Sequence, residues 1–147
     1  KNKYQTILIL EDDCIFRKKF WEHFQKQYNS IQENKPNWEL LYLGCSQHGW
    51  PKSIKYFRDF YQCQNSFGGF AYALNYRMFE KILELSDTLE QPIDWVYVGI
   101  QRNLSKGIAF YPHLITANVA KESSTDGHQE DQREYMLGNR LKYHHFF

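Results

Sequence analysis

The chain has little of what marks the most easily recognised classes of protein. It contains three cysteines in 147 residues, too few and too widely spaced for a disulfide framework or a zinc knuckle, so free thiols in a reducing compartment are expected. Its 18 basic and 17 acidic residues leave a net charge of +1, which gives no broad electrostatic attraction to nucleic acid or to an anionic membrane. No apolar run approaches the roughly 20 residues of a spanning helix, and no signal peptide is visible. These absences predict a cytoplasmic protein without a membrane segment.

Several catalytic motifs are missing as well. There is no Gly-x-Ser-x-Gly elbow and no Cys/His pair in a recognisable context, which argues against a nucleophilic mechanism. Neither a Walker loop nor a Gly-x-Gly-x-x-Gly sequence is present, so a kinase, a P-loop enzyme or a dinucleotide-dependent oxidoreductase is not expected. Apolar residues make up 42% of the chain and aromatic residues 18%, and this composition predicts a folded domain.

Strand-like and helix-like segments alternate along the chain, and the alternation predicts a layered α/β domain. The expected strands are 7–10, 38–43, 67–74 and 108–111, and the expected helices are about 17–33, 77–89 (with Met78, Ile82, Leu83 and Leu85 facing inward) and 92–101. Residues 45–66 are expected to form a long loop, with a short element near 54–61. We expect one domain over residues 1–147. Because so few strands leave a sheet edge open, we also expect cover from upstream sequence or from self-association, and the start at Lys1 suggests a fragment of a larger fold.

The segment from Ile7 to Asp13 is the hardest to explain by folding alone. Ile7 to Leu10 are all apolar, which predicts a strand buried on both faces at the centre of a parallel or mixed sheet. Glu11, Asp12 and Asp13 follow directly and would lie at the carboxyl end of that strand, where such sheets bind ligands. Adjacent carboxylates raise one another's pKa values unless a cation or hydrogen-bond donors hold them ionised. Oxygen-rich sites suit Mg²⁺ or Mn²⁺. The alternative is a helix N-terminus, where the helix dipole favours acids.

Further candidates follow later in the chain. Gly68 and Gly69 let the backbone approach a sugar or phosphate, or form a tight packing turn. Phe70 and Tyr72 are candidates for an aromatic surface under a sugar, although alternation along a strand places one of them, preferably Tyr72, in the core. Less specific candidates are His113 and His128 as metal ligands, Trp50 as a stacking residue beside His48, and Ser123, Ser124 and Asp126 near a phosphate or metal; the alternatives are core, solvated loop or turn residues.

Five segments, in order, resemble glycosyltransferase family 25, which includes bacterial lipooligosaccharide galactosyltransferases, collagen galactosyltransferases and giant-virus relatives. They are Leu10-Glu11-Asp12-Asp13 before an aromatic helix, 38–44, 69–74, Pro92-Ile93-Asp94, and Tyr111-Pro112 ahead of Ser123-Ser124. Each motif is short, but their order and spacing extend over nearly the whole chain. The family's N-terminal segment, which supplies the first strands of the nucleotide-binding half, has no counterpart before Lys1.

The resemblance implies a Rossmann-like, type-A glycosyltransferase fold that moves a hexose with inversion from a UDP-sugar to a glycan or protein hydroxyl. It implies that Asp13 binds Mn²⁺ or Mg²⁺ directly, with Glu11 serving the metal through water or contacting the ribose. Asp12, between them, could point either way, and is grouped with the two glycines as donor-binding. Asp94 is the candidate base that deprotonates the acceptor; the alternative is a helix cap. Two other functions stay open, namely a phosphotransferase or nucleotidyltransferase that uses the same acids and a non-catalytic carbohydrate-binding module.

Overall fold

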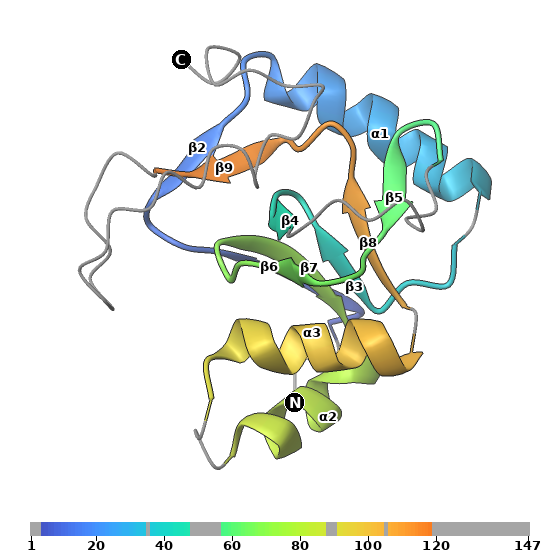
Figure 1. Cartoon of the computed structure of the whole chain (residues 1–147). Coiled ribbons are helices and arrows are strands. Elements are labelled where there is room, and N and C mark those ends of the chain that lie inside the picture. The colour runs from blue at the N-terminus through green and yellow to red at the C-terminus, as the bar shows by residue number, and fades with distance from the viewer. Residues whose placement is uncertain (1–3, 35, 48–56, 88–90, 105, 119–147) are drawn as a thin grey trace.

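The chain forms a mixed α/β structure in which helices cover both faces of a five-stranded sheet (Figure 1), as the computed structural model shows for residues 4–34, 36–47, 57–87, 91–104 and 106–118. The order across this sheet is β1 (Thr6–Leu10), β7 (Ala71–Asn75), β3 (Leu40–Tyr42), β8 (Gly107–Phe110) and β5 (Phe60–Gln62). Two smaller sheets pair β2 (Cys14–Phe16) with β9 (Ile115–Ala117) and β4 (Ser46–Gln47) with β6 (Ser66–Phe67). The helices are α1 (Phe20–Asn34), η1 (Tyr76–Met78), α2 (Phe79–Ser86) and α3 (Ile93–Leu104). The predicted α/β class is confirmed at this level.

Strand direction places three strand ends at one edge of the sheet. β3 and β8 are parallel, and β7 is antiparallel to both β1 and β3, so β1, β3 and β8 all run the same way. Their carboxyl ends therefore meet at the edge where β7 begins. This is the edge at which α/β sheets commonly bind ligands.

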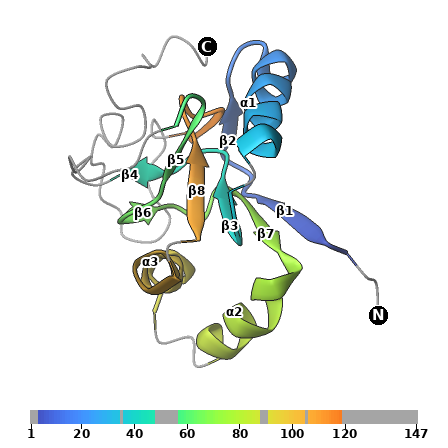
Figure 2. The same ribbon diagram turned by 90° about the vertical axis from the view of Figure 1, so that its right-hand side faces the viewer.

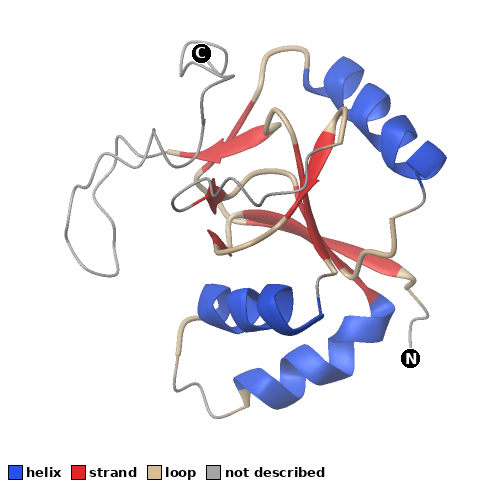
Figure 3. Cartoon of the chain, turned by 45° about the vertical axis from the view of Figure 1, so that its right-hand side comes forward, coloured by secondary structure: helices blue, strands red, loops and turns tan. Residues whose placement is uncertain are grey.

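Alternation along the central strands divides the core into two clusters, one on each face of the sheet. In β3, Leu41 belongs to the cluster that includes Ile31 of α1, whereas Leu40 and Tyr42 belong to the cluster that includes Ile82 of α2. Figure 3 shows the same division, with α1 on one side of the sheet and α2 and α3 on the other. All three residues of β3 are buried because both faces of this strand are covered.

The expectation that Ile7 to Leu10 form a central strand buried on both faces is wrong. They do form a strand, β1, but it lies at the edge of the sheet and extends away from it (Figure 2). Ile7 and Ile9 pack against the core, whereas Leu8 and Leu10 are exposed on the opposite face. In the described part of the chain no strand pairs with the outer edge of β1, so self-association through this edge stays a prediction.

Three other expectations are corrected. The segment 67–74 is not one strand, because Gly68 to Phe70 separate β6 from β7. In the helix expected over 77–89, Met78 and Ile82 are buried as predicted, but Leu83 and Leu85 are exposed, since α2 turns only a narrow face to the sheet. The strand at 108–111 is not the last one, because β9 follows it and pairs with β2.

At Gly44, just after β3, the backbone passes very close to the segment of Leu114 and Ile115. Leu114 N–H donates to the carbonyl of Leu43 at 2.8 Å, and a Cβ added to Gly44 would lie 1.8 Å from the carbonyl oxygen of Ile115. Because that neighbour is backbone, Gly44→Ala is expected to lower the free energy of unfolding by about 3 kcal/mol. The matched control is Gly99→Ala in α3, where no atom lies within 4 Å of the added Cβ. It should raise the free energy by about 0.5–1 kcal/mol. Urea denaturation of both variants checks this pair, and equal stabilities would contradict the close approach.

Candidate functional site

Glu11, Asp12 and Asp13 lie where the sequence predicts them, at the carboxyl end of β1. The backbone N–H of Glu11 donates to the carbonyl of Phe70 at 2.9 Å, which joins the end of β1 to the start of β7. The alternative of a helix N-terminus does not hold, because β2 follows the three acids and α1 begins only at Phe20. The carboxylates therefore need another explanation than a helix dipole.

Asp94 is brought to the same place from far along the chain. It lies in the first turn of α3, and its neighbour Ile93 approaches Gly69 closely, since a Cβ added to Gly69 would be 3.7 Å from Cγ2 of Ile93 and 3.0 Å from Oε1 of Glu11. The pKa of Glu11 is raised, first by burial and then by the negative charges of Asp13, Asp12 and Asp94. The charges of the three aspartates therefore all act on Glu11, and we call these four residues the acidic cluster.

Two carboxylate oxygens of the acidic cluster are buried without a partner. Oδ1 of Asp13 and Oδ1 of Asp94 are inaccessible to solvent and accept no hydrogen bond from the described residues, a property otherwise shared there only by Oε1 of Gln27 on α1. A buried acceptor left unsatisfied costs about 1–3 kcal/mol, so such atoms in native proteins call for a specific explanation. A cation or a hydroxyl donor of a bound molecule would satisfy both oxygens.

Asp13 and Glu11 are the residues that could hold a hard divalent cation together with oxygens of a bound ligand. Within the described ranges no group of three His, Cys, Asp or Glu side chains is arranged to hold a metal by itself. Mg²⁺ is usually held by one or two carboxylates together with phosphate oxygens and water, which does not need a third side chain. Asp13 has an unsatisfied carboxylate oxygen that such a cation would need, and Glu11 is close enough for the charge of Asp13 to raise its pKa.

The two glycines have different roles in the structure. Gly68 has φ +116°, a conformation that side chains rarely adopt, so the turn between β6 and β7 is enough to require glycine there. At Gly69 an added Cβ would lie 3.0 Å from Oε1 of Glu11, so any side chain there would press on the end of the Glu11 carboxylate. Contact of either glycine with a donor stays a prediction. Phe70 and Tyr72 are both buried, so the expected aromatic surface for a sugar is wrong for Phe70, while Tyr72 is in the core as preferred.

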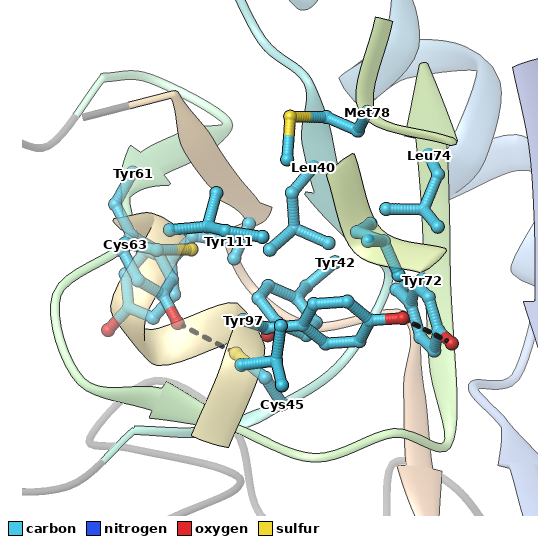
Figure 4. Close-up of a cluster of buried hydrophobic side chains, with 14 residues drawn as sticks. Leu40, Tyr42, Cys45, Tyr61, Cys63, Tyr72, Leu74, Met78, Tyr97 and Tyr111 are labelled. Carbon is cyan, nitrogen blue, oxygen red and sulfur yellow. Dashed lines mark hydrogen bonds between the residues drawn. The ribbon is translucent and has the colours of Figure 1, made fainter. Parts of the chain in front are cut away.

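Sequence reasoning missed a pair of phenols below the acidic cluster. The hydroxyl of Tyr97 in α3 donates to the hydroxyl of Tyr72 in β7 at 2.8 Å (Figure 4). Burial raises the pKa of the Tyr72 hydroxyl, and the negative charge of Glu11 raises it further. This hydroxyl therefore lies within electrostatic range of the acidic cluster. The signal was in the sequence, since Tyr97 is three residues after Asp94 and shares its face of the helix.

The other predicted candidates are core residues or lie outside the description. His113 is buried with Nε2 at 3.1 Å from the hydroxyl of Tyr61, which is the core alternative rather than a metal ligand. Cys14, Cys45 and Cys63 are all free, as expected. The thiol of Cys14 donates to the carbonyl of Phe70 at 2.8 Å, and burial raises its pKa to about 11, so it is not a nucleophile at neutral pH. Six of the predicted candidates lie outside the described ranges, namely His48, Trp50, Ser123, Ser124, Asp126 and His128.

Comparison with known proteins does not decide the function. No family model, no curated protein and no solved structure matches the chain, so the resemblance to glycosyltransferase family 25 stays a prediction. None of the helices in the described ranges is long and apolar enough to span a bilayer.

Charge repulsion in the acidic cluster predicts a pH-dependent effect of Glu11→Gln. Because the pKa of Glu11 is higher in the folded chain than its ordinary value of 4.5, its contribution to stability is complete below pH 4.5 and is lost as pH rises through the folded pKa. Without metal, Glu11→Gln should therefore unfold a few degrees above the wild type at pH 7, and the difference should vanish at pH 4. Thermal unfolding at both pH values checks this. Glu22→Gln on the exposed surface of α1 is the control, and an equal rise there would contradict the cluster.

Proposed function

We propose that this chain is a metal-dependent, inverting glycosyltransferase domain of the type-A fold, similar to glycosyltransferase family 25. It transfers a hexose from a UDP-sugar to an acceptor hydroxyl. The observation that carries the proposal is the convergence of Asp13 and Asp94, each with a buried, unpartnered oxygen, beside Glu11.

The arrangement of the strands supports the proposal. The mixed sheet presents the carboxyl ends of β1, β3 and β8 at one edge, and the acidic cluster lies at that edge. Gly69 removes the side chain that would otherwise meet the Glu11 carboxylate, so the backbone of residues 68–70 passes directly beside it. A polar ligand held there would replace the missing hydrogen-bond partners of both aspartates.

Each carboxylate has a chemical role in this reaction. Asp13 and Glu11 would hold Mn²⁺ or Mg²⁺, which when bound acts as a Lewis acid toward the negative charge that grows on the departing diphosphate. Asp94 accepts the proton of the acceptor hydroxyl, whose oxygen forms a bond to the anomeric carbon while the bond to the phosphate oxygen breaks and its electron pair leaves with UDP. Attack from the face opposite the phosphate inverts the anomeric configuration. Asp12 is more exposed to solvent than Asp13, and its negative charge helps to raise the pKa of Glu11.

A turnover assay with defined products tests the proposal. The chain is incubated with Mn²⁺, with UDP-glucose or UDP-galactose, and with a mixture of methyl glycosides. The products are identified by mass spectrometry and NMR. UDP together with a glycoside of inverted anomeric configuration is the expected result. Release of orthophosphate or UMP would instead indicate the phosphotransferase or nucleotidyltransferase function, and donor binding without any product would indicate a binding module.

A further inference from the structure

Trp95 is an exposed aromatic residue at the start of α3. Its side chain is 51% exposed although it follows Asp94 directly in the first turn of α3. Val96 and Tyr97, the next two residues of the helix, are buried in the core. Single exposed aromatic residues are common on protein surfaces, so the neighbours of Trp95 decide whether it marks a binding site.

The ring of Trp95 is held in place by a neighbour. It packs edge-on against Phe67, with ring centroids 5.0 Å apart and an interplanar angle of 77°. The backbone just before Phe67 is anchored to α3, because the side chain of Gln101 binds both backbone groups of Ser66, accepting from its N–H at 2.9 Å and donating to its carbonyl at 2.7 Å. The two rings therefore come from β6 and α3, and these two elements are joined by the hydrogen bonds of Gln101.

The aromatic pair comes from the same two segments that carry parts of the acidic cluster and its neighbours. Trp95 adjoins Asp94 in sequence, and Phe67 is two residues before Gly69, whose backbone lies against the Glu11 carboxylate. A molecule resting on Trp95 would lie over the first turn of α3, the turn that also carries Asp94 and its unpartnered oxygen.

We propose that Trp95, supported by Phe67, is the stacking platform for the acceptor, and that the acceptor is a sugar residue rather than a protein or lipid hydroxyl. This inference rests on the proposed function. A pyranose has a face of C–H groups with partial positive charge, which suits the negative face of an indole ring, and hydroxyls that suit a carboxylate. A serine or threonine side chain offers the hydroxyl without the apolar ring face.

Binding without donor or metal tests the platform separately from catalysis. Saturation-transfer NMR is recorded with methyl β-galactopyranoside and methyl β-glucopyranoside, with N-acetylserine amide as the non-sugar hydroxyl. We expect signals from the ring C–H protons of a glycoside and none from the amide. Trp95→Ala should weaken glycoside binding about tenfold, whereas Trp95→Phe should keep most of it. Trp21→Ala is the matched control, since Trp21 is 70% exposed but lies on α1.

The outcomes separate the platform from the proposed function. Glycoside binding that survives in Trp95→Ala, or equal binding of the serine amide, would overturn the platform. In turnover assays, Trp95→Ala should raise the KM for the acceptor and leave the KM for the UDP-sugar unchanged. A rise in the donor KM alone would mean that the ring stacks on uracil and would also overturn it. Glycoside binding through Trp95 without any turnover would retain the platform and reject the transferase. Circular dichroism of each variant verifies that it is folded.

Discussion

Asp94→Asn should lower kcat for sugar transfer by about 10²–10⁴-fold while leaving the affinity for UDP and Mn²⁺ unchanged. The amide has nearly the shape of the carboxylate but cannot accept the acceptor's proton. Oδ1 of Asp94 is buried and makes no hydrogen bond to the described residues, so the substitution should break no contact of that atom. Steady-state rates with saturating donor and isothermal titration with UDP measure the two quantities.

The competing explanation for Asp94 is that it only stabilises the start of α3. A first-turn acid contributes about 0.3–1 kcal/mol through the helix dipole. Glu80 is the matched control because it lies in the first turn of α2, as Asp94 does in that of α3. If Asp94→Asn and Glu80→Gln lower stability alike and transfer continues at the wild-type rate in both, Asp94 is a helix residue and not the base.

Asp13→Ala should weaken Mn²⁺-dependent binding of UDP by about 100-fold or more and abolish transfer. The reason is that Asp13 supplies the one oxygen of the three consecutive acids that is buried with no partner in the described structure. The chain without ligands should not be destabilised, because the variant removes a buried, unsatisfied carboxylate oxygen and relieves the repulsion with Glu11. Titration calorimetry with UDP at fixed Mn²⁺ measures the affinity.

The control for Asp13 is Asp87→Ala, an exposed aspartate just after α2. It removes the same charge from the chain without touching the acidic cluster, so it should bind UDP and Mn²⁺ as the wild type does. Asp12→Ala should give an intermediate loss, because Asp12 contributes charge to the cluster but has no orphaned oxygen. Equal losses in all three variants would mean that binding follows net charge and not a built site.

The place of the acidic residues in the fold could be predicted from the sequence because it follows from the order of residues along the chain. Three acids after an apolar strand predict a ligand site whichever strands lie beside it, and Glu11 to Asp13 do lie at the carboxyl edge. Asp94 was placed through its motif and the helix that follows, and α3 begins one residue before it. What could not be predicted was the packing around them. An apolar run such as Ile7 to Leu10 is the same in sequence whether a second layer covers it or, as here, leaves Leu8 and Leu10 in water.

The missed features depend on contacts between distant segments. Residues 67–74 have the apolar pattern of a single strand, but the positive φ of Gly68 separates β6 from β7. Leu83 is exposed because only one face of α2 meets the sheet. Trp95 was overlooked for the same reason. Its proposed role depends on Phe67 and on the side chain of Gln101, which binds Ser66 35 residues earlier in the chain. Periodicity describes each element by itself and carries no information about such pairs.

The most direct test of the acidic cluster is a thermal-unfolding experiment on the wild-type chain at pH 7 with UDP, with Mn²⁺, and with both together. A ligand at 100 times its Kd that binds only the folded state stabilises it by about 2.7 kcal/mol. The predicted result is a clear rise in Tm that requires both ligands, since the metal is completed by the phosphates, and that is absent in Asp13→Ala. A full rise with UDP alone, no rise with the combination, or the same rise in Asp13→Ala would contradict a metal-dependent nucleotide-sugar site.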